Sequence, residues 1–221
     1  MELEVLYEDN HILVAVKPQN VPSMPDASGD MDMLTAVKAY VKEKYGKPGD
    51  VYIGLVHRLD RPTGGVMVFA RTSKAAARLC KQFAEKSMAK EYLAVVRGTM
   101  DQAEGTLEHW LEKDEDENTV RTVQEGQGKR AELQYKTLQS KDGLSLLQIR
   151  LMTGRGHQIR VQLAAGGHPI LGDMKYGRNE RKGNLMLWAF KLTIEHPTKK
   201  ESMTFTAMPQ GKGWEMARGA V

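Results

Sequence analysis

The stretch "GLVHRLDRPTGGVMVFAR", residues 54–71, decides much of the fold. The apolar residues of 51–56 predict a strand that leads into it. The run 65–70 is too short for a helix and rich in β-branched residues, so it predicts a second, buried strand. Proline and two glycines at 62–65 predict a turn between the two. The stretch is therefore expected to form a strand, a charged turn and a strand.

Asp60 stands out in this turn because Arg58 and Arg61 flank it. A guanidinium group close to a carboxylate favours the ionised form. Strands on both sides would hold Asp60 in a fixed place, and loops mounted in this way often carry function. An ionised aspartate there could act as a nucleophile, a general base or a metal ligand. The local sequence fits a turn-capping aspartate beside two surface arginines equally well.

The composition of the 221-residue chain is that of a folded, water-soluble protein, with 41% hydrophobic and 27% charged residues. No apolar run approaches the roughly 20 residues that a membrane-spanning helix needs. The acidic start, MELEVLYEDN, does not resemble a signal peptide. The single cysteine, Cys80, excludes an internal disulfide and fits a reducing cytoplasm. Its place among Leu79 and Phe83 in a helical pattern predicts a small core residue.

The distribution of charge says more than the net charge of +4. Acidic residues gather in Glu112–Glu117, which predicts a solvated loop. Basic residues instead accompany the motifs that contain glycine and histidine: Arg58, Arg61, Arg71, Arg155, Arg160, Lys175 and Arg178. We therefore expect a positive surface around those motifs.

Outward from residues 54–71, short strands outnumber helices. Helical spacing of apolar residues predicts helices at 33–45, 74–87 and 157–165. Further strands are expected at 3–7, 12–16, 91–97, 133–138, 144–151, 185–194 and 202–205. The sequence Lys141–Asp142–Gly143 predicts a hairpin turn between two of them. Because no linker interrupts the pattern, we predict one α+β domain over residues 1–221, with a mostly antiparallel sheet.

Several kinds of site find no support in the sequence. There is no His-x-x-x-His, no cysteine pair and no acidic cluster near the glycine-rich turn, so no metal site is predicted. A glycosidase would need a second carboxylate in surroundings like those of Asp60, and no other acidic residue of the sequence has them. The patterns G-x-S-x-G and G-x-x-x-x-G-K-S/T, typical of serine nucleophiles and phosphate loops, are absent.

A second unusual stretch is "TGRGHQIRVQL", residues 153–163, in which two glycines flank Arg155 directly before a predicted helix. Backbone N–H groups at glycine-rich turns and helix starts attract anions, and arginine is the usual bidentate partner of phosphate. On the helix, His157 and Arg160 lie along one side. A phosphate-contacting face is one interpretation, and an amphipathic helix with a solvated basic face is the other.

Together, "GLVHRLDRPTGGVMVFAR" (54–71), "KEYLAVVRG" (90–98) and "TGRGHQIRVQLAAGGHPILGDMKYG" (153–177) resemble the successive motifs of the RluA-type RNA pseudouridine synthases. "KPQNVPSMP" (17–25) near the start and "LMLWAFKL" and "HP" near the end stand in the expected order. The resemblance spans nearly the whole chain. It implies an enzyme that isomerises uridine to pseudouridine within RNA without a cofactor or metal. It also implies a mixed, mostly antiparallel bent sheet with flanking helices and a central active-site cleft, which agrees with the α+β prediction.

The resemblance also implies catalytic roles. Asp60 corresponds to the aspartate that attacks the uridine, and whether it attacks the ribose or the base, or mainly assists glycal formation, stays open. Tyr92 corresponds to the active-site tyrosine that packs against the target base, although a half-buried strand tyrosine would show the same local sequence. Arg160 corresponds to the arginine that pairs with the catalytic aspartate and keeps it ionised.

Contacts to RNA are implied as well. Arg58 corresponds to the residue that fills the gap left by the flipped nucleotide, where a planar cation can stack. The other expected RNA contacts are His57, Arg155 and His157. Ile159 and Leu163 either line the base pocket or only pack the helix.

The main hypothesis is a cytoplasmic isomerase that acts on structured rRNA or tRNA, needs no cofactor and works as a monomer. Because the catalytic motifs begin within the first residues, we expect the chain to lack the small S4-type RNA-binding domain that many relatives carry ahead of them. The alternative is a non-catalytic RNA-binding module with the same fold, which the presence of Asp60, Tyr92 and Arg160 disfavours. A glycosylase that releases the base would share the cleavage chemistry.

Overall fold

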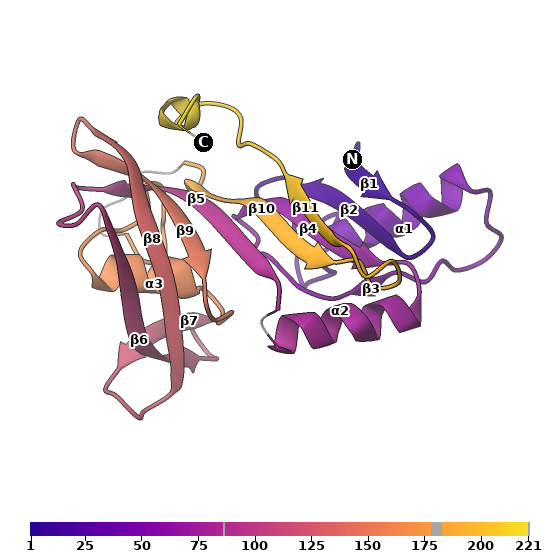
Figure 1. Ribbon diagram of the computed structural model, residues 1–221, viewed down its shortest axis with the longest axis horizontal. Helices are drawn as coiled ribbons and strands as arrows, with labels where there is room; N and C mark the ends of the chain where they lie inside the picture. Colours follow the sequence, from indigo (N-terminus) through magenta and orange to yellow (C-terminus); the bar gives the residue numbers. More distant parts are fainter. Residues whose placement is uncertain (86, 178–182, 221) are drawn as a thin grey trace. The chain divides into compact units, whose positions relative to one another are not determined.

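The computed structural model folds into two compact units (Figure 1). The residues that the structure describes are 1–85, 87–177 and 183–220. The first unit comprises Met1–Ala89 and Ala189–Met208, and the second comprises Lys90–Trp188 and Pro209–Val221. The expectation of a single domain over residues 1–221 stays a prediction. Each unit is described by itself below.

The first unit is built on strands in the order β1-β2-β4-β10, with β3 beside β4 and β11 beside β10. Its strands are β1 (Glu4–Glu8), β2 (Ile12–Lys17), β3 (Gly54–Leu55), β4 (Gly64–Ala70), β10 (Leu187–Glu195) and β11 (Ser202–Thr206). Its helices are α1 (Met33–Lys44) and α2 (Ser73–Glu85). The pairs β1–β2, β2–β4, β3–β4 and β10–β11 are all antiparallel. The strand predicted over 51–56 is shorter than expected and is reduced to β3.

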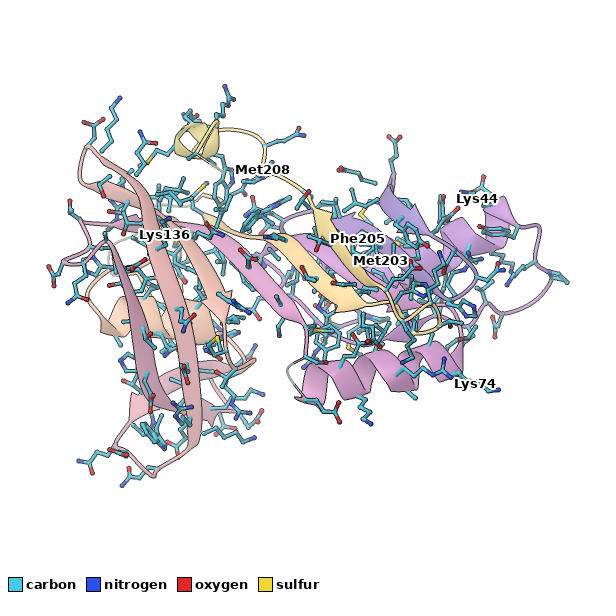
Figure 2. The ribbon with its side chains drawn as sticks, viewed as in Figure 1. Lys44, Lys74, Lys136, Met203, Phe205 and Met208 are labelled. Atoms are coloured by element: carbon cyan, nitrogen blue, oxygen red, sulfur yellow. The ribbon has the colours of Figure 1, made fainter. Side chains whose placement is uncertain are left out.

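The core of the first unit lies around β2 and β4, in which every residue is buried, as their unbroken apolar runs predict. Helix α2 contributes Ala75 and Leu79 to a cluster that includes Val14 and Val68 from these strands. Phe205 of β11 belongs to the same cluster, and Figure 2 labels it together with its neighbour Met203. The charged turn of residues 54–71 is therefore attached to a fully buried strand.

Helix α2 buries a different side from the one predicted. The hydroxyl of Thr72 caps the helix by accepting the N–H of Ala75 at 3.1 Å. Leu79 is buried and Phe83 is half-buried against the core, whereas Cys80 is exposed. The prediction that Cys80 is a core residue was wrong because the large apolar side chains, Leu79 and Phe83, decide which side of the helix faces the sheet.

The second unit is a sheet in the order β5-β9-β8-β6-β7 with one α-helix. Its strands are β5 (Ala89–Arg97), β6 (Glu104–Asp114), β7 (Thr119–Val123), β8 (Lys129–Lys141) and β9 (Leu144–Leu151). Its helices are α3 (Gln158–Ala165) and the 3-10 turn η1 (Glu215–Ala217). The strands β6 and β7 were not foreseen. Glu112–Glu117 is exposed as predicted, but it begins inside β6 rather than forming a loop throughout.

The predicted hairpin is present between β8 and β9. Its two central residues, Asp142 and Gly143, have φ angles of 52° and 73°. A two-residue turn with both φ angles positive matches the twist of antiparallel strands, and the sequence Asp-Gly is the one that favours it.

Helix α3 lies against the sheet of the second unit. Six of its residues are buried, from Gln158 to Leu163. Val161 packs in a cluster with Leu111, Val120 and Ala131 from β6, β7 and β8. The interpretation of this helix as amphipathic with a solvated basic face was therefore wrong, because Arg160 is buried together with its neighbours and forms its ion pair with Asp173. None of the described helices is long and apolar enough to cross a membrane.

Candidate active site

Asp60 lies in the turn between β3 and β4 and is half-buried. Its carbonyl oxygen accepts the N–H of Thr63 at 2.9 Å, which closes the turn. The preceding residue, Leu59, is 7% exposed, whereas Arg61 on the other side is exposed. The carboxylate thus stands between a buried anchor and a solvated arginine.

Lys17, at the end of β2, is a residue of this region that the sequence did not single out. Its side chain is completely buried, and Nζ donates to the carbonyls of Pro18 at 3.1 Å, Val21 at 2.6 Å and Arg61 at 2.9 Å. Burial lowers the pKa of Lys17 to about 7, and the negative charge of Asp60 raises it in part. The sequence did hold one sign of this buried lysine, because Lys17 directly follows five apolar residues and precedes a proline.

Arg61 binds the loop that precedes α1. Nη1 donates to Ser28 Oγ at 3.0 Å, and the guanidinium forms ion pairs with Asp30 and, at 3.6 Å, with Asp26. These partners are exposed, so the pairs contribute little to stability. They nevertheless give Arg61 partners that the sequence did not suggest, in the loop that precedes α1.

Arg58 and His57 differ in their surroundings. Arg58 is exposed, with Nη1 at 3.9 Å from Met24 Sδ, and its expected contact with RNA stays a prediction. His57 Nε2 accepts the N–H of Val68 at 3.0 Å, and its ring stacks on Phe83 with centroids 4.8 Å apart. His57 therefore supports the backbone of β4, and its role in RNA binding stays a prediction.

In the second unit, Tyr92 lies on β5 opposite Ile149 and is 7% exposed. Lys90, two residues earlier, lies close to the turn that precedes α3. A Cβ added to Gly154 would lie 3.1 Å from Lys90 Nζ. Burial lowers the pKa of Lys90. The structure thus brings the "KEY" strand and the "TGRG" turn together, as parts of one region.

Arg160 forms a bidentate ion pair with Asp173. Nε and Nη2 donate to the two carboxylate oxygens at 2.8 and 2.7 Å, and both residues are buried, at 6% and 1% exposed. The same carboxylate accepts the backbone N–H groups of Lys175 and Tyr176 at 3.0 and 3.1 Å. Burial alone would raise the pKa of Asp173, but Arg160 and these N–H groups lower it overall.

Asp173 was missed by the sequence analysis, although it is the only acid of the motif 153–177. Asp173 lies 13 residues after Arg160, outside the helix that carries Arg160, so no helical or strand spacing in the sequence links the two. The pairing of Arg160 with Asp60 stays a prediction.

Tyr176 connects this ion pair to the rest of the unit. Its hydroxyl accepts the N–H of Val120 at 2.9 Å and lies 2.7 Å from His157 Nδ1. The guanidinium carbon of Arg160 lies 5.1 Å from the centre of the Tyr176 ring. His157 itself adopts a left-handed conformation with φ of 52° at the start of α3. His157 and Arg160 are therefore oriented by the same tyrosine.

The other residues expected at the site fall into two groups. Arg155 is exposed, and its Nε donates to the carbonyl of Arg130 at 3.2 Å. Ile159 and Leu163 are 4% and 0% exposed, so both pack the helix, and a role in the base pocket stays a prediction. Arg178 lies outside the described residues.

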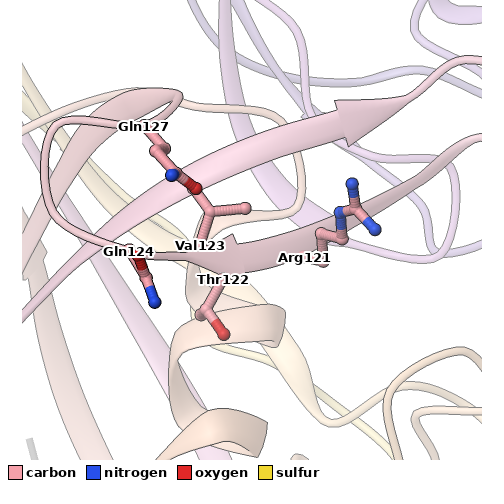
Figure 3. Close-up of a pocket in the computed structure, with 5 residues that line it drawn as sticks. All are labelled: Arg121, Thr122, Val123, Gln124 and Gln127. Carbon is pink, nitrogen blue, oxygen red and sulfur yellow. The ribbon is translucent and has the colours of Figure 1, made fainter.

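Within the described part of the chain, no group of three or more histidine, cysteine or acidic side chains is placed to hold a metal ion. A shallow depression on the second unit lies at the end of β7 (Figure 3). It is lined by Arg121, Thr122, Val123, Gln124 and Gln127. None of these is a predicted site residue, and most are exposed, so the depression adds nothing to the site.

Comparison with known proteins agrees with the motifs. The family model described as RNA pseudouridylate synthase matches residues 11–165. The chain belongs to this family. Dual-specificity RNA pseudouridine synthase RluA of Escherichia coli K12 is 36% identical over 93% of this chain and 92% of its own length. An uncharacterized RNA pseudouridine synthase of Bacillus subtilis, YhcT, is 37% identical over 90% of this chain and 66% of its own length.

Solved structures show the same fold. Human RNA pseudouridylate synthase domain containing 4 matches with a TM-score of 0.78 and 24% identity, over 93% of this chain and 88% of that one. Human RNA pseudouridylate synthase domain containing 1 matches with a TM-score of 0.73 and 26% identity, over 94% and 84%. The predicted α+β class and the RluA-type resemblance are thereby confirmed.

Proposed function

We propose that this RNA pseudouridine synthase converts uridine into pseudouridine within a structured rRNA or tRNA, with Asp60 as the attacking group. The observation that carries the proposal is the placement of Asp60. Its carboxylate lies on a turn whose backbone is fixed to buried groups, among them the side chain of Lys17. A carboxylate mounted in this way is suited to attack because its position is defined.

The reaction is an isomerisation. Asp60 attacks the uridine, the glycosidic bond between C1′ and N1 breaks, and the uracil turns. A bond then forms between C1′ and C5, and the bond that Asp60 made in its attack breaks, which restores the free carboxylate. The proton on C5 leaves and N1 takes one up, so the product has the composition of the substrate. No oxidant or reductant takes part in this balance.

The second unit supplies the remaining groups of the proposal. Tyr92 on β5 is proposed to pack against the target base, and Arg160 is the third proposed catalytic residue. Asp173 fixes the guanidinium of Arg160 through two hydrogen bonds. Arg58 stacks in the vacancy left by the flipped base, which offsets part of the few kcal/mol that base extrusion costs.

The proposed substrate class follows from relatives that act on RNA. The Escherichia coli relative is named a dual-specificity RNA pseudouridine synthase. A second relative, from Zymomonas mobilis, is named ribosomal large subunit pseudouridine synthase D. It is 35% identical over 94% of this chain and 70% of its own length. We propose that the chain acts as a cytoplasmic monomer. Phosphate contacts release counterions, so binding to RNA is expected to weaken as salt increases.

The proposal is tested with RNA that carries tritium at C5 of uridine. Release of tritium together with formation of pseudouridine is the expected result, because C5 loses its hydrogen when it bonds to C1′. Free uracil would instead identify a glycosylase. Binding of RNA without any release, across total rRNA and tRNA, would identify a non-catalytic module and refute the proposal.

A further inference from the structure

The backbone on both sides of Asp60 is held by buried side chains. Ser23, which is 6% exposed, accepts the N–H of Leu59 with Oγ at 3.1 Å and donates to the carbonyl of the same residue at 2.7 Å. On the other side, Lys17 Nζ donates to the carbonyl of Arg61 at 2.9 Å. The residues immediately before and after Asp60 are thus each fixed by one side chain.

These side chains come from a single segment, residues 17–23. The segment makes a third contact with the turn, from Gln19 Nε2 to the carbonyl of Pro62 at 3.2 Å. It is itself anchored, because the carbonyl of Pro22 accepts the N–H of Met33 at the start of α1 at 2.9 Å. Ser23 Oγ also lies 3.8 Å from Met67 Sδ on β4. The segment therefore connects the turn to both α1 and the core strand.

We propose that Ser23 is a positioning residue of the active site, which fixes the direction of the Asp60 side chain through the two hydrogen bonds to Leu59. This inference rests on the proposed role of Asp60 as the attacking group. Ser23 acts through the backbone of its neighbour and needs no contact with substrate.

The chemistry of serine explains why one residue can do this. A hydroxyl both donates and accepts, so a single atom satisfies the N–H and the C=O of Leu59 at the same time. Leu59 is 7% exposed, and its backbone groups have little access to water if the hydroxyl is lost. Unpaired buried groups are costly, so the turn would shift to find new partners. A shift of about 1 Å at a reacting group can lower the rate about 100-fold.

The test compares two hydroxyl deletions in the same loop. Ser23→Ala removes both hydrogen bonds to Leu59, whereas Ser28→Ala removes only exposed hydrogen bonds, with Arg61, the Asp26 carboxylate and the N–H of Asp30. For Ser23→Ala we expect kcat for pseudouridine formation to fall about 10- to 100-fold while KM stays within threefold of the wild-type value. For Ser28→Ala we expect both constants to stay within twofold. Hydrogen exchange of the Leu59 amide should become faster in Ser23→Ala only.

The outcomes separate this inference from the proposed function. If the wild-type protein forms no pseudouridine, the proposed function is refuted, and the inference falls with it. If the wild type and Ser28→Ala are active and Ser23→Ala keeps the wild-type kcat, the inference alone is overturned. The inference is also overturned if the lower kcat of Ser23→Ala returns to the wild-type value once it is calculated per folded molecule.

If Ser23→Ala does not fold, Ser23→Cys decides the question, because the thiol has nearly the same shape and is a much weaker hydrogen-bonding group. A lower kcat with an unchanged KM and an unchanged unfolding temperature supports the role of Ser23. A wild-type kcat in Ser23→Cys overturns it.

Discussion

Asp173 offers the sharpest test of how the second unit is held together. Among the described residues of the unit, Arg160–Asp173 and Arg130–Glu108 are bidentate pairs between an arginine and a carboxylate. In the pair Arg160–Asp173 the side chains are 7% and 0% exposed, and in the pair Arg130–Glu108 they are 47% and 40% exposed. Arg130 also pairs with Glu132 at 2.8 Å, so Arg130–Glu108 serves as the exposed, less critical pair of the comparison.

The substitution Asp173→Asn keeps the size of the side chain and removes its charge. Removing one partner of a buried pair costs about 3–5 kcal/mol, because the remaining charge is poorly compensated. In a protein of this size, 1 kcal/mol corresponds to roughly 2–4 °C in unfolding temperature. We therefore expect Asp173→Asn to lower the unfolding temperature by roughly 6–20 °C. Glu108→Gln is expected to cost less than about 1 kcal/mol, because water screens the exposed pair.

Tryptophan fluorescence during urea unfolding is a suitable assay. All three tryptophans, Trp110, Trp188 and Trp214, belong to the second unit and report on its unfolding. The pKa of Asp173 is held below its ordinary value of 3.8, so the stabilisation is present above that pH and is lost as the pH falls through the lower, folded-state pKa. The difference between wild type and Asp173→Asn should therefore shrink in acid. Equal effects of Asp173→Asn and Glu108→Gln, or a difference that does not change with pH, would refute this reasoning.

Two further predictions concern residues that the sequence did not single out. The pKa of Lys17 is about 7 in the folded protein and ordinarily 10.5, so between these values the unfolded chain binds the proton and stability rises with pH. From pH 7 to pH 9, wild type should gain about 2 kcal/mol in urea unfolding relative to Lys17→Met, and parallel curves would contradict this. Tyr176→Phe removes the hydroxyl that serves Val120 and His157 and should cost about 1–3 kcal/mol in the same measurement. A cost below about 0.5 kcal/mol would show that the hydroxyl does not hold these groups.

Much of the fold was predictable where local patterns decide it. The buried strands β2 and β4 follow from unbroken apolar runs, and the β8–β9 hairpin follows from Asp142–Gly143. Cys80 was misplaced because neighbouring residues of a helix point in different directions, so the side that buries Leu79 leaves Cys80 exposed. The strands β6 and β7 were not predicted, because nearly all residues of β6 are half-buried or exposed and only Leu111 is buried.

The candidate site divides in the same way. Asp60 was identified because the motif around it is unusual, with three charges in four residues before a proline. Ser23 was not identified, because it binds the backbone of Leu59. Every residue type has the same backbone groups, so such a contact cannot be read from the sequence. Asp173 was missed for a related reason, since its pairing with Arg160 depends on how the chain returns to α3.

The central claim is that Asp60 is the attacking carboxylate, and one comparison tests it most directly. Asp60→Asn and Asp30→Asn each remove one negative charge from the first unit, but only Asp60 lies on the proposed reaction path. Single-turnover release of tritium from C5-labelled RNA should be abolished in Asp60→Asn, with binding to RNA retained, and should be unchanged in Asp30→Asn. Release at the wild-type rate from folded Asp60→Asn protein would contradict the account.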